Sequence, residues 1–407
     1  MNLIQKFKVI AGLPTFHVLL ALCACHCIND LLQSVVSASY PLLKVDLSLD
    51  FAQIGLITLV YQIAASVFQP VVGYAFDRHP FAGSLPMGLV CTSTGIALLA
   101  FSGSFAMVLC AVFVLGLGSA TLHPEASRIT SLASMGRRGM AQSVFQVGGN
   151  FGGSIGPLLV AVIVAPHSRL YILWFLVVSA IGFWVMGIVY RWYRGYLRQA
   201  RSQAGGKIPH KPLPLSVPRT VFAISILMVL IFSKYVYMAS ITSYYTFFLI
   251  QKFGVSISAS QICLFVFLFA TAAGTLVGGP IGDRYGRKPV IWASILGTAP
   301  FSLVMPYSNL PVTIVLSFCA GFVLSSAFPA ILLYSQELLP NHLGMVSGLF
   351  FGFAFGIGGI ASGVLGSFAD TYGIEAIYDF CAWMPLIGLV ACFLPNLKTQ
   401  KESCQKA

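Results

Sequence analysis

The feature that most restricts the fold of this chain is a series of long apolar runs, separated by polar or turn-rich breaks. A run of about 20 apolar residues is long enough to cross the hydrocarbon core of a bilayer as an α-helix. A helix is favoured there because it satisfies its own backbone hydrogen bonds. Twelve such runs lie at approximately 17–41, 52–76, 84–102, 106–127, 141–165, 170–191, 220–250, 259–281, 289–307, 311–335, 344–368 and 377–395. We therefore predict an all-α polytopic membrane protein with twelve transmembrane helices.

The low charge content also favours a membrane protein over the soluble classes. Charged residues make up 8% of the 407 positions, whereas soluble domains contain about 25%. So little polar surface argues against a cytosolic enzyme, a secreted disulfide scaffold, a disordered chain and an ordinary nucleic-acid-binding domain. Most of the ten cysteines lie in apolar runs, where cysteine behaves as a small apolar residue. We predict a protein that is not an enzyme and that needs no metal and no cofactor.

One break is much longer than the others and divides the runs into two sets of six. Residues 192–218 combine several Arg and Lys residues with glycines and prolines. This composition is typical of a linker. The predicted domains are an N-terminal six-helix half at 1–191, a basic linker at 192–218, a C-terminal six-helix half at 219–398 and a tail at 399–407.

The distribution of Lys and Arg predicts the orientation in the membrane, because cytoplasmic loops are enriched in these residues. With both termini in the cytoplasm, 19 of the 23 Lys and Arg residues lie on the cytoplasmic side. Lys44, Arg169 and Lys252 lie on the opposite side, and Lys234 falls inside a span. We predict that both termini are cytoplasmic. This asymmetry also accounts for the net charge of +12 without a nucleic-acid partner.

Two landmarks recur in the two halves of the chain. The segment 73–78 (Gly-x-x-x-Asp-Arg) follows the second run and recurs at 279–284, 206 residues later. Gly116 and Pro124 in the fourth run recur as a Gly and a Pro in the tenth run, 205 residues later. A duplicated six-span unit predicts a transporter with its substrate site between the halves, near the middle of the bilayer, that works by alternating access.

The second copy of this loop, residues 279–289 (Gly-Pro-Ile-Gly-Asp-Arg-Tyr-Gly-Arg-Lys-Pro), resembles the loop signature of the major facilitator superfamily. Its glycines allow a tight turn between helices. Its Asp can cap the N-terminus of a neighbouring helix or pair with an Arg. The resemblance implies a conformational role for Gly73, Asp77, Arg78, Gly279, Asp283, Arg284 and Arg287.

Glycines are concentrated at the start of the fifth run, where five of them between positions 148 and 156 precede Pro157. Small residues three or four positions apart let two helices pack closely, and proline bends a helix. The pattern resembles the fifth-helix motif of twelve-span drug antiporters, which implies exchange rather than uptake. In that interpretation Gly152, Gly156 and Pro157 have a conformational role; ordinary small-residue packing is the alternative.

Ionisable residues inside the predicted spans are candidates for function. A charge there costs about 2.5 kcal/mol or more unless it faces water or a partner. His26 and Asp30 are four residues apart and share a face of the first helix. The fourth helix carries His123, Glu125 and Arg128, of which the last two are three residues apart and share a face. The alternative is a structural network that clamps helices together.

The seventh predicted span carries Lys234 about halfway along, with Tyr237 on the same side. No acidic residue lies on this span to neutralise the ammonium group. Its partner is therefore a carboxylate from another helix, Asp30 or Glu125, or an anionic substrate.

Several segments resemble fosmidomycin-resistance proteins, which are bacterial inner-membrane exporters of the major facilitator superfamily. They are residues 25–34 (Cys-His-Cys-Ile-Asn-Asp-Leu-Leu-Gln-Ser), 40–43, 69–74, 123–128 (His-Pro-Glu-Ala-Ser-Arg) and 141–151. The likeness covers most of the chain and is densest before residue 165. The chain departs from many proton-coupled drug antiporters at Val112, where those proteins carry an Arg four residues before a Gly.

The resemblance implies a proton-coupled antiporter that exports fosmidomycin and related small anions across the bacterial inner membrane and confers drug resistance. Cationic side chains suit a phosphonate drug, because Arg and Lys bind its oxygens with charge-assisted hydrogen bonds. We expect proton coupling by Asp30, Glu125 and His26, and substrate binding by His123, Arg128, Lys234 and Tyr237. The expected partners are the drug, protons and the lipid bilayer, for a protein that works as a monomer. The alternative is a proton-coupled uptake symporter for a small phosphorylated or carboxylated metabolite.

Overall fold

The computed structural model describes residues 15–39, 42–43, 46–49, 51–164, 166–203, 212–255 and 257–397. Within these ranges the ordered elements are helices, without strands. The Cα positions divide the chain into two compact units. The first comprises residues 1–211 and 341–352, and the second comprises residues 212–340 and 353–407.

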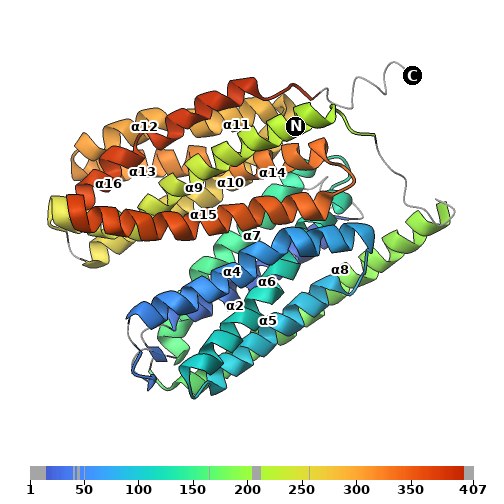
Figure 1. Cartoon of the computed structure of the whole chain (residues 1–407), viewed down its shortest axis with the longest axis horizontal. Helices are drawn as coiled ribbons and strands as arrows, with labels where there is room; N and C mark the ends of the chain where they lie inside the picture. Colours follow the sequence, from blue (N-terminus) through green and yellow to red (C-terminus); the bar gives the residue numbers. More distant parts are fainter. Residues whose placement is uncertain are drawn as a thin grey trace. The chain divides into compact units, whose positions relative to one another are not determined.

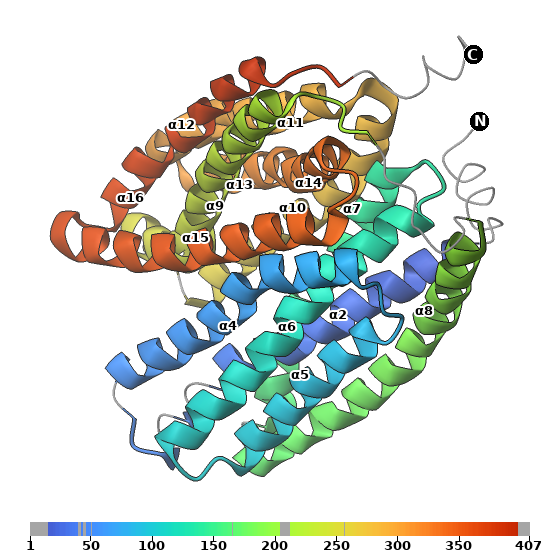
Figure 2. The same ribbon diagram turned by 45° about the vertical axis from the view of Figure 1, so that its right-hand side comes forward.

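The first unit contains six long helices. They are α2 (Phe16–Ala38), α4 (Phe51–Arg78), α5 (Ser84–Phe101), α6 (Phe105–Ala133), α7 (Arg138–Leu159) and α8 (Phe175–Gln203), with short helical segments at Val160–Val164 and Arg169–Trp174. The Ser104 side chain caps α6 by accepting a hydrogen bond from the amide of Met107, as expected for serine at this position. In Figure 2, α4, α6 and α5 run side by side. The α2 helix packs along α6 and, over a longer stretch, along α7.

The second unit is also helical (Figure 1). Its helices are α9 (Val217–Phe253), α10 (Ile257–Tyr285), α11 (Arg287–Leu296), α12 (Ala299–Val304), α13 (Leu310–Ser325), α14 (Ala327–Leu338), α15 (Leu343–Tyr372) and α16 (Ile374–Cys381), with 3-10 segments at Met305–Tyr307 and Met384–Phe393. The first residues of α15 belong to the first unit. The α9 helix ends at Gly254, whose φ of 65° is left-handed, a conformation that glycine adopts without steric cost.

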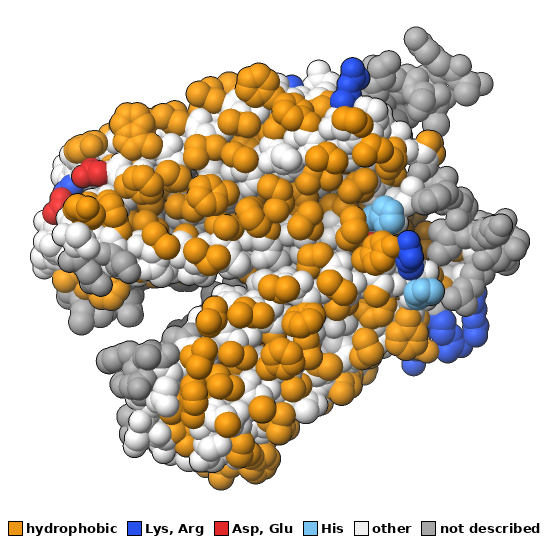
Figure 3. Space-filling model, viewed as in Figure 1, with side chains coloured by type: hydrophobic (Ala, Val, Ile, Leu, Met, Phe, Trp, Pro, Cys, Tyr) orange, Lys and Arg blue, Asp and Glu red, His pale blue; other side chains and the backbone are white. Residues whose placement is uncertain are grey.

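Eleven helices in the described part of the chain are long and apolar enough to cross a membrane. They match eleven of the twelve predicted runs. On the face that Figure 3 draws, apolar side chains predominate, and the few Lys, Arg, Asp and Glu side chains lie toward its margins. The remaining run, residues 141–165, coincides with α7 and the segment after it. The α7 helix is not among the eleven; it contains six glycines together with Gln, Ser and Asn residues.

The predicted linker at 192–218 is helical at both of its ends. The α8 helix continues to Gln203, and α9 begins at Val217. Helix-favouring residues extend α8, and the rings of Trp192 and Tyr196, one turn apart, stack with centroids 5.6 Å apart. The Gly-Gly and proline positions that suggested a linker come only after Gln203.

Candidate functional site

Three ionisable side chains of α2 and α6 meet inside the first unit. Asp30 Oδ2 lies 3.2 Å from His26 Nε2, and Asp30 Oδ1 lies 3.2 Å from His123 Nε2. The first contact confirms the pairing predicted from the four-residue spacing of His26 and Asp30. The second was not predicted, because His123 had been grouped with Glu125 and Arg128. We call His26, Asp30 and His123 the histidine–aspartate cluster.

Backbone carbonyl groups fix the orientation of both imidazole rings. His26 Nδ1 lies 2.8 Å from the carbonyl oxygen of Phe145 on α7, and His123 Nδ1 lies 3.0 Å from that of Ser119. A carbonyl oxygen only accepts hydrogen bonds, so each Nδ1 carries a hydrogen. Each Nε2 therefore points toward the carboxylate of Asp30. The ring of Phe145 also stacks on His26, with centroids 4.1 Å apart.

The two imidazoles of the cluster are buried, whereas its carboxylate is partly exposed. The side chains of His26 and His123 are 0% and 1% exposed, whereas that of Asp30 is 21% exposed. Asp30 is thus the partly exposed member of the cluster. The donor atoms lie within 4.8 Å of one another and could hold protons or a single metal ion. None of the cysteines at positions 23, 25 and 27 belongs to this group of ligand atoms within the described part of the chain.

The glycines of α7 allow its backbone to approach this cluster closely. A Cβ atom at Gly149 would overlap the ring of His26 and lie 2.7 Å from Asp30 Oδ2. A Cβ at Gly152 would overlap the carbonyl oxygen of Cys27, and one at Gly156 would overlap the Ser34 hydroxyl. The glycine pattern thus closes one side of the cluster. Pro157 lies near the end of the same helix.

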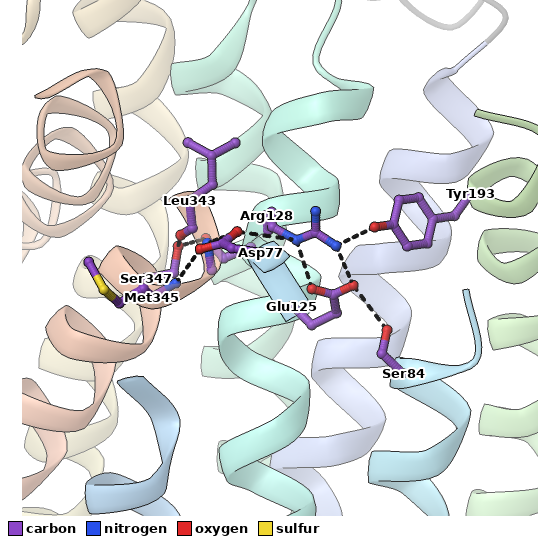
Figure 4. A network of polar contacts seen from close by, with 10 residues as sticks. Asp77, Ser84, Glu125, Arg128, Tyr193, Leu343, Met345 and Ser347 are labelled. Atoms are coloured by element: carbon purple, nitrogen blue, oxygen red, sulfur yellow. Dashed lines mark hydrogen bonds and ion pairs between the residues drawn. The ribbon is translucent and has the colours of Figure 1, made fainter. Parts of the chain in front are cut away.

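The second group of charges centres on Arg128, which lies on another face of α6 (Figure 4). Arg128 donates through Nε and Nη2 to the two carboxylate oxygens of Glu125, each at 2.8 Å. It also donates to the hydroxyl of Tyr193 on α8, and Ser84 donates to Glu125 at 3.0 Å. The predicted pairing of Glu125 with Arg128 is confirmed. The sequence did not predict a role for Tyr193 or Ser84. Each lies on a different helix from Arg128, and neither is part of a recognisable sequence motif.

Asp77, in the first copy of the loop motif, caps the N-terminus of α15 (Figure 4). Its carboxylate accepts hydrogen bonds from the amides of Gly344 at 3.0 Å and Met345 at 2.9 Å. Its Oδ1 also lies 3.8 Å from Arg128 Nε. Capping of a helix and pairing with an Arg were the two alternatives expected for the Asp of this motif, and an anion at a helix N-terminus is stabilised by the helix dipole. At Gly73, a Cβ would overlap the carbonyl group of Gly344.

The other motif residues also make local contacts. Arg78 lies over the ring of Tyr74, 4.7 Å from its centroid. In the second copy, Asp283 pairs with Arg287 at 2.9 Å, and Arg287 lies 3.4 Å from Glu337. Arg284 lies over the ring of Tyr285, and Gly279 is a buried residue of α10.

Lys234 lies in the second unit, where it is 5% exposed on α9. Its Nζ is 5.4 Å from the ring centroid of Phe328 and 5.5 Å from that of Tyr235, so aromatic faces stabilise its positive charge. Among the described residues it forms no ion pair. Three residues further along, the buried hydroxyl of Tyr237 has no hydrogen-bond partner among those residues. The carboxylates proposed as partners, Asp30 and Glu125, are engaged by the histidines and by Arg128.

Comparison with known proteins gives a consistent result. The family model of the Major Facilitator Superfamily matches residues 22–263 and 226–406. The chain is 53% identical over 382 residues to the fosmidomycin resistance protein of Escherichia coli (strain K12), covering 94% of this chain and 93% of that protein. It is 37% identical to an uncharacterized MFS-type transporter of Bacillus subtilis (strain 168), covering 96% of each.

Solved structures agree in fold alone. The E. coli fucose:proton symporter FucP superposes with a TM-score of 0.71 at 16% identity, over 93% of this chain and 98% of that one. The human organic anion transporter MFSD10 gives a TM-score of 0.71 at 17% identity, over 93% of this chain and 100% of that one. With the helices, the repeated loop motif and these matches together, the chain belongs to the major facilitator superfamily of membrane transporters and, within it, to the fosmidomycin-resistance protein family.

Proposed function

We propose that this transporter is a proton-coupled antiporter that exports fosmidomycin and related small anions across the bacterial inner membrane by alternating access, with both termini in the cytoplasm. The name of its 53% identical relative supports the substrate. The observation that carries the coupling is the histidine–aspartate cluster. It places two buried imidazoles against one partly exposed carboxylate, and His and Asp side chains inside membrane spans are typical of proton relays in transporters.

The contacts favour separate roles for the two groups of charges in the first unit. Asp30 and His26 are the proposed proton carriers. Glu125, predicted from the sequence for the same role, is held in a two-point contact by Arg128. We assign this pair to the network that ends on Asp77 and the start of α15, where it governs a conformational step. Nε and Nη2 of Arg128 are then engaged, so that Arg128 does not offer this pair of donors to a substrate phosphonate.

We assign substrate binding to Lys234, with Tyr237 beside it. A buried ammonium without a carboxylate partner favours an anionic ligand, because the ligand supplies the missing counter-charge. The hydroxyl of Tyr237 adds a hydrogen-bond donor in the same buried region of α9.

Lys234→Gln is expected to weaken fosmidomycin binding at least about tenfold, a loss of about 1.4 kcal/mol. The glutamine keeps much of the length of the side chain but removes the charge-assisted contact. Isothermal titration of purified protein measures the effect. Lys252→Gln is the matched control, because Lys252 lies at the end of α9 and donates to the carbonyl of Pro306. Wild-type affinity in Lys234→Gln would remove this residue from the drug site.

An electrostatic argument favours the alternative, an uptake symporter. Protonation makes the histidine–aspartate cluster more positive, and a more positive cluster attracts an anion. If proton binding strengthens drug binding, protons and drug cross the membrane in the same direction, as in a symporter. If proton binding weakens drug binding, they cross in opposite directions, as in an antiporter. The direction of coupling therefore decides between the two functions.

The test is drug movement in proteoliposomes with an imposed pH difference and the membrane potential held at zero. The antiporter accumulates fosmidomycin in the acidic compartment, because protons leave that compartment as drug enters it. A symporter accumulates the drug in the alkaline compartment instead. Protein-free liposomes give the background. Accumulation on the alkaline side would replace the antiporter with the symporter.

A further inference from the structure

The geometry of the histidine–aspartate cluster bears on the number of protons that it carries. The two imidazoles face different oxygens of the same carboxylate, His26 facing Oδ2 and His123 facing Oδ1, each at 3.2 Å. Because both Nδ1 atoms donate to backbone carbonyls, neither ring can present an N–H to Asp30 unless Nε2 is also protonated. Each contact is therefore attractive with a proton on that Nε2 and repulsive without one.

Neighbouring groups restrain both rings in addition to the contacts with Asp30. Phe145 stacks on His26, and the ring of Phe351 lies 5.3 Å from that of His123. Ser119 contacts His123 Nδ1 through its hydroxyl at 3.2 Å as well as through its carbonyl. A deprotonated ring is thus kept against the carboxylate, where it is ready to accept a proton again.

Other ionisable groups near the cluster are neutral or engaged elsewhere. The thiols of α2 are buried or partly buried, and a cysteine thiol is mostly neutral near pH 7. On α6, Glu125 and Arg128 pair with each other, and Tyr193 of α8 contacts Arg128. The α7 helix has one ionisable residue, Arg138, at its first position. Asp30 also accepts a hydrogen bond from the neutral amide of Asn29 at 3.1 Å. The two imidazoles are thus the groups placed to change the charge beside Asp30.

We propose that the histidine–aspartate cluster binds two protons in each transport cycle, one on Nε2 of His26 and one on Nε2 of His123, with Asp30 as their shared acceptor. His123, assigned to the substrate by the sequence, then belongs to proton coupling. The protons enter by way of Asp30, the one member of the three with a partly exposed side chain. Loading changes the cluster from one net negative charge to one net positive charge. The proposal rests on the proposed proton-coupled function.

The number of protons is measured in the same proteoliposomes at zero membrane potential, in a pH range where the phosphonate stays fully ionised. For each imposed pH difference, the drug ratio at which net drug flux is zero is determined. The logarithm of this ratio, plotted against the pH difference, has a slope equal to the number of protons per drug molecule. The drug ratio at zero net flux is set by the balance of the proton and drug gradients. It therefore does not depend on how much active protein is present.

We expect a slope of about two for the wild type and about one for His26→Gln and for His123→Gln, since two coupled sites become one. The matched control is His167→Gln, which changes an exposed histidine and keeps a slope of about two.

A wild-type slope of about one, or a slope that neither cluster variant alters, would overturn the two-proton cluster and leave the proposed transport function standing. A wild-type slope of zero would overturn both. The sign of the slope reports antiport or symport and is independent of the proton number. If one histidine variant does not fold, the wild-type slope and the other variant still decide.

Discussion

We expect Asp30→Asn to abolish proton-driven fosmidomycin accumulation, so that it falls to the background of protein-free liposomes. The asparagine keeps the shape of the side chain, so the α2–α6 contact survives. It removes the negative charge that both imidazoles face. Without that charge, a proton on either Nε2 is no longer stabilised by an opposite charge. Downhill drug exchange between equal pH compartments is expected to continue. Drug uptake is measured with and without the pH difference.

The control is Asp46→Asn, which also removes a carboxylate that forms an ion pair. Asp46 is 41% exposed and lies 3.7 Å from Arg169, and exposed pairs of this kind contribute about 0–1 kcal/mol. This variant is expected to accumulate drug as the wild type does. Wild-type accumulation in Asp30→Asn would take the carboxylate off the proton path, and the cluster would then be a structural clamp.

Gly152→Ala is expected to lower the free energy of unfolding by about 1–3 kcal/mol and to remove most transport. The added Cβ would overlap the carbonyl oxygen of Cys27, so α2 and α7 must separate. This carbonyl is backbone in the middle of a helix and cannot move aside alone. The separation also displaces Phe145, whose carbonyl orients His26. Thermal unfolding in detergent and transport in proteoliposomes measure the two effects.

The neighbouring glycine supplies the control for this substitution. A Cβ at Gly153 meets no atom within 4 Å, so Gly153→Ala adds the same methyl group to the same helix without a clash. It is expected to keep or slightly raise stability, because alanine favours a helix over glycine by about 1 kcal/mol. Equal melting temperatures for the two variants would contradict the close packing of α2 on α7.

The packing also shows why the two interpretations of the α7 glycines are compatible. The sequence left open whether these residues serve a conformational motif or ordinary small-residue packing. The close approach at Gly152 and Gly156 is helix packing of the kind that small residues allow. The contact at Gly149 ties the same packing to the histidine–aspartate cluster. Movement of α7 against α2 therefore changes the surroundings of the proposed proton site.

The amino-acid sequence by itself determined the membrane helices and the contacts made within one helix. The length of the apolar runs reflects the thickness of the bilayer core, so eleven runs were found where the structure has apolar helices. The run at 141–165 is not among these helices; its glycines at 149, 152 and 156 lie against α2. His26 with Asp30 and Glu125 with Arg128 were predicted because helical geometry fixes which residues share a face.

Only the tertiary structure decided which of these faces meet. His123 lies two residues from Glu125, yet it turns to Asp30 on α2 while Glu125 turns to Arg128 and Ser84. Likewise, the partners of Asp77 lie at the start of α15, more than 260 residues further along the chain. The rotation of each helix about its axis and the choice of its neighbours depend on packing summed over many side chains, which a local pattern does not contain. The cluster on which the proposed coupling depends is therefore a property of the packed helices.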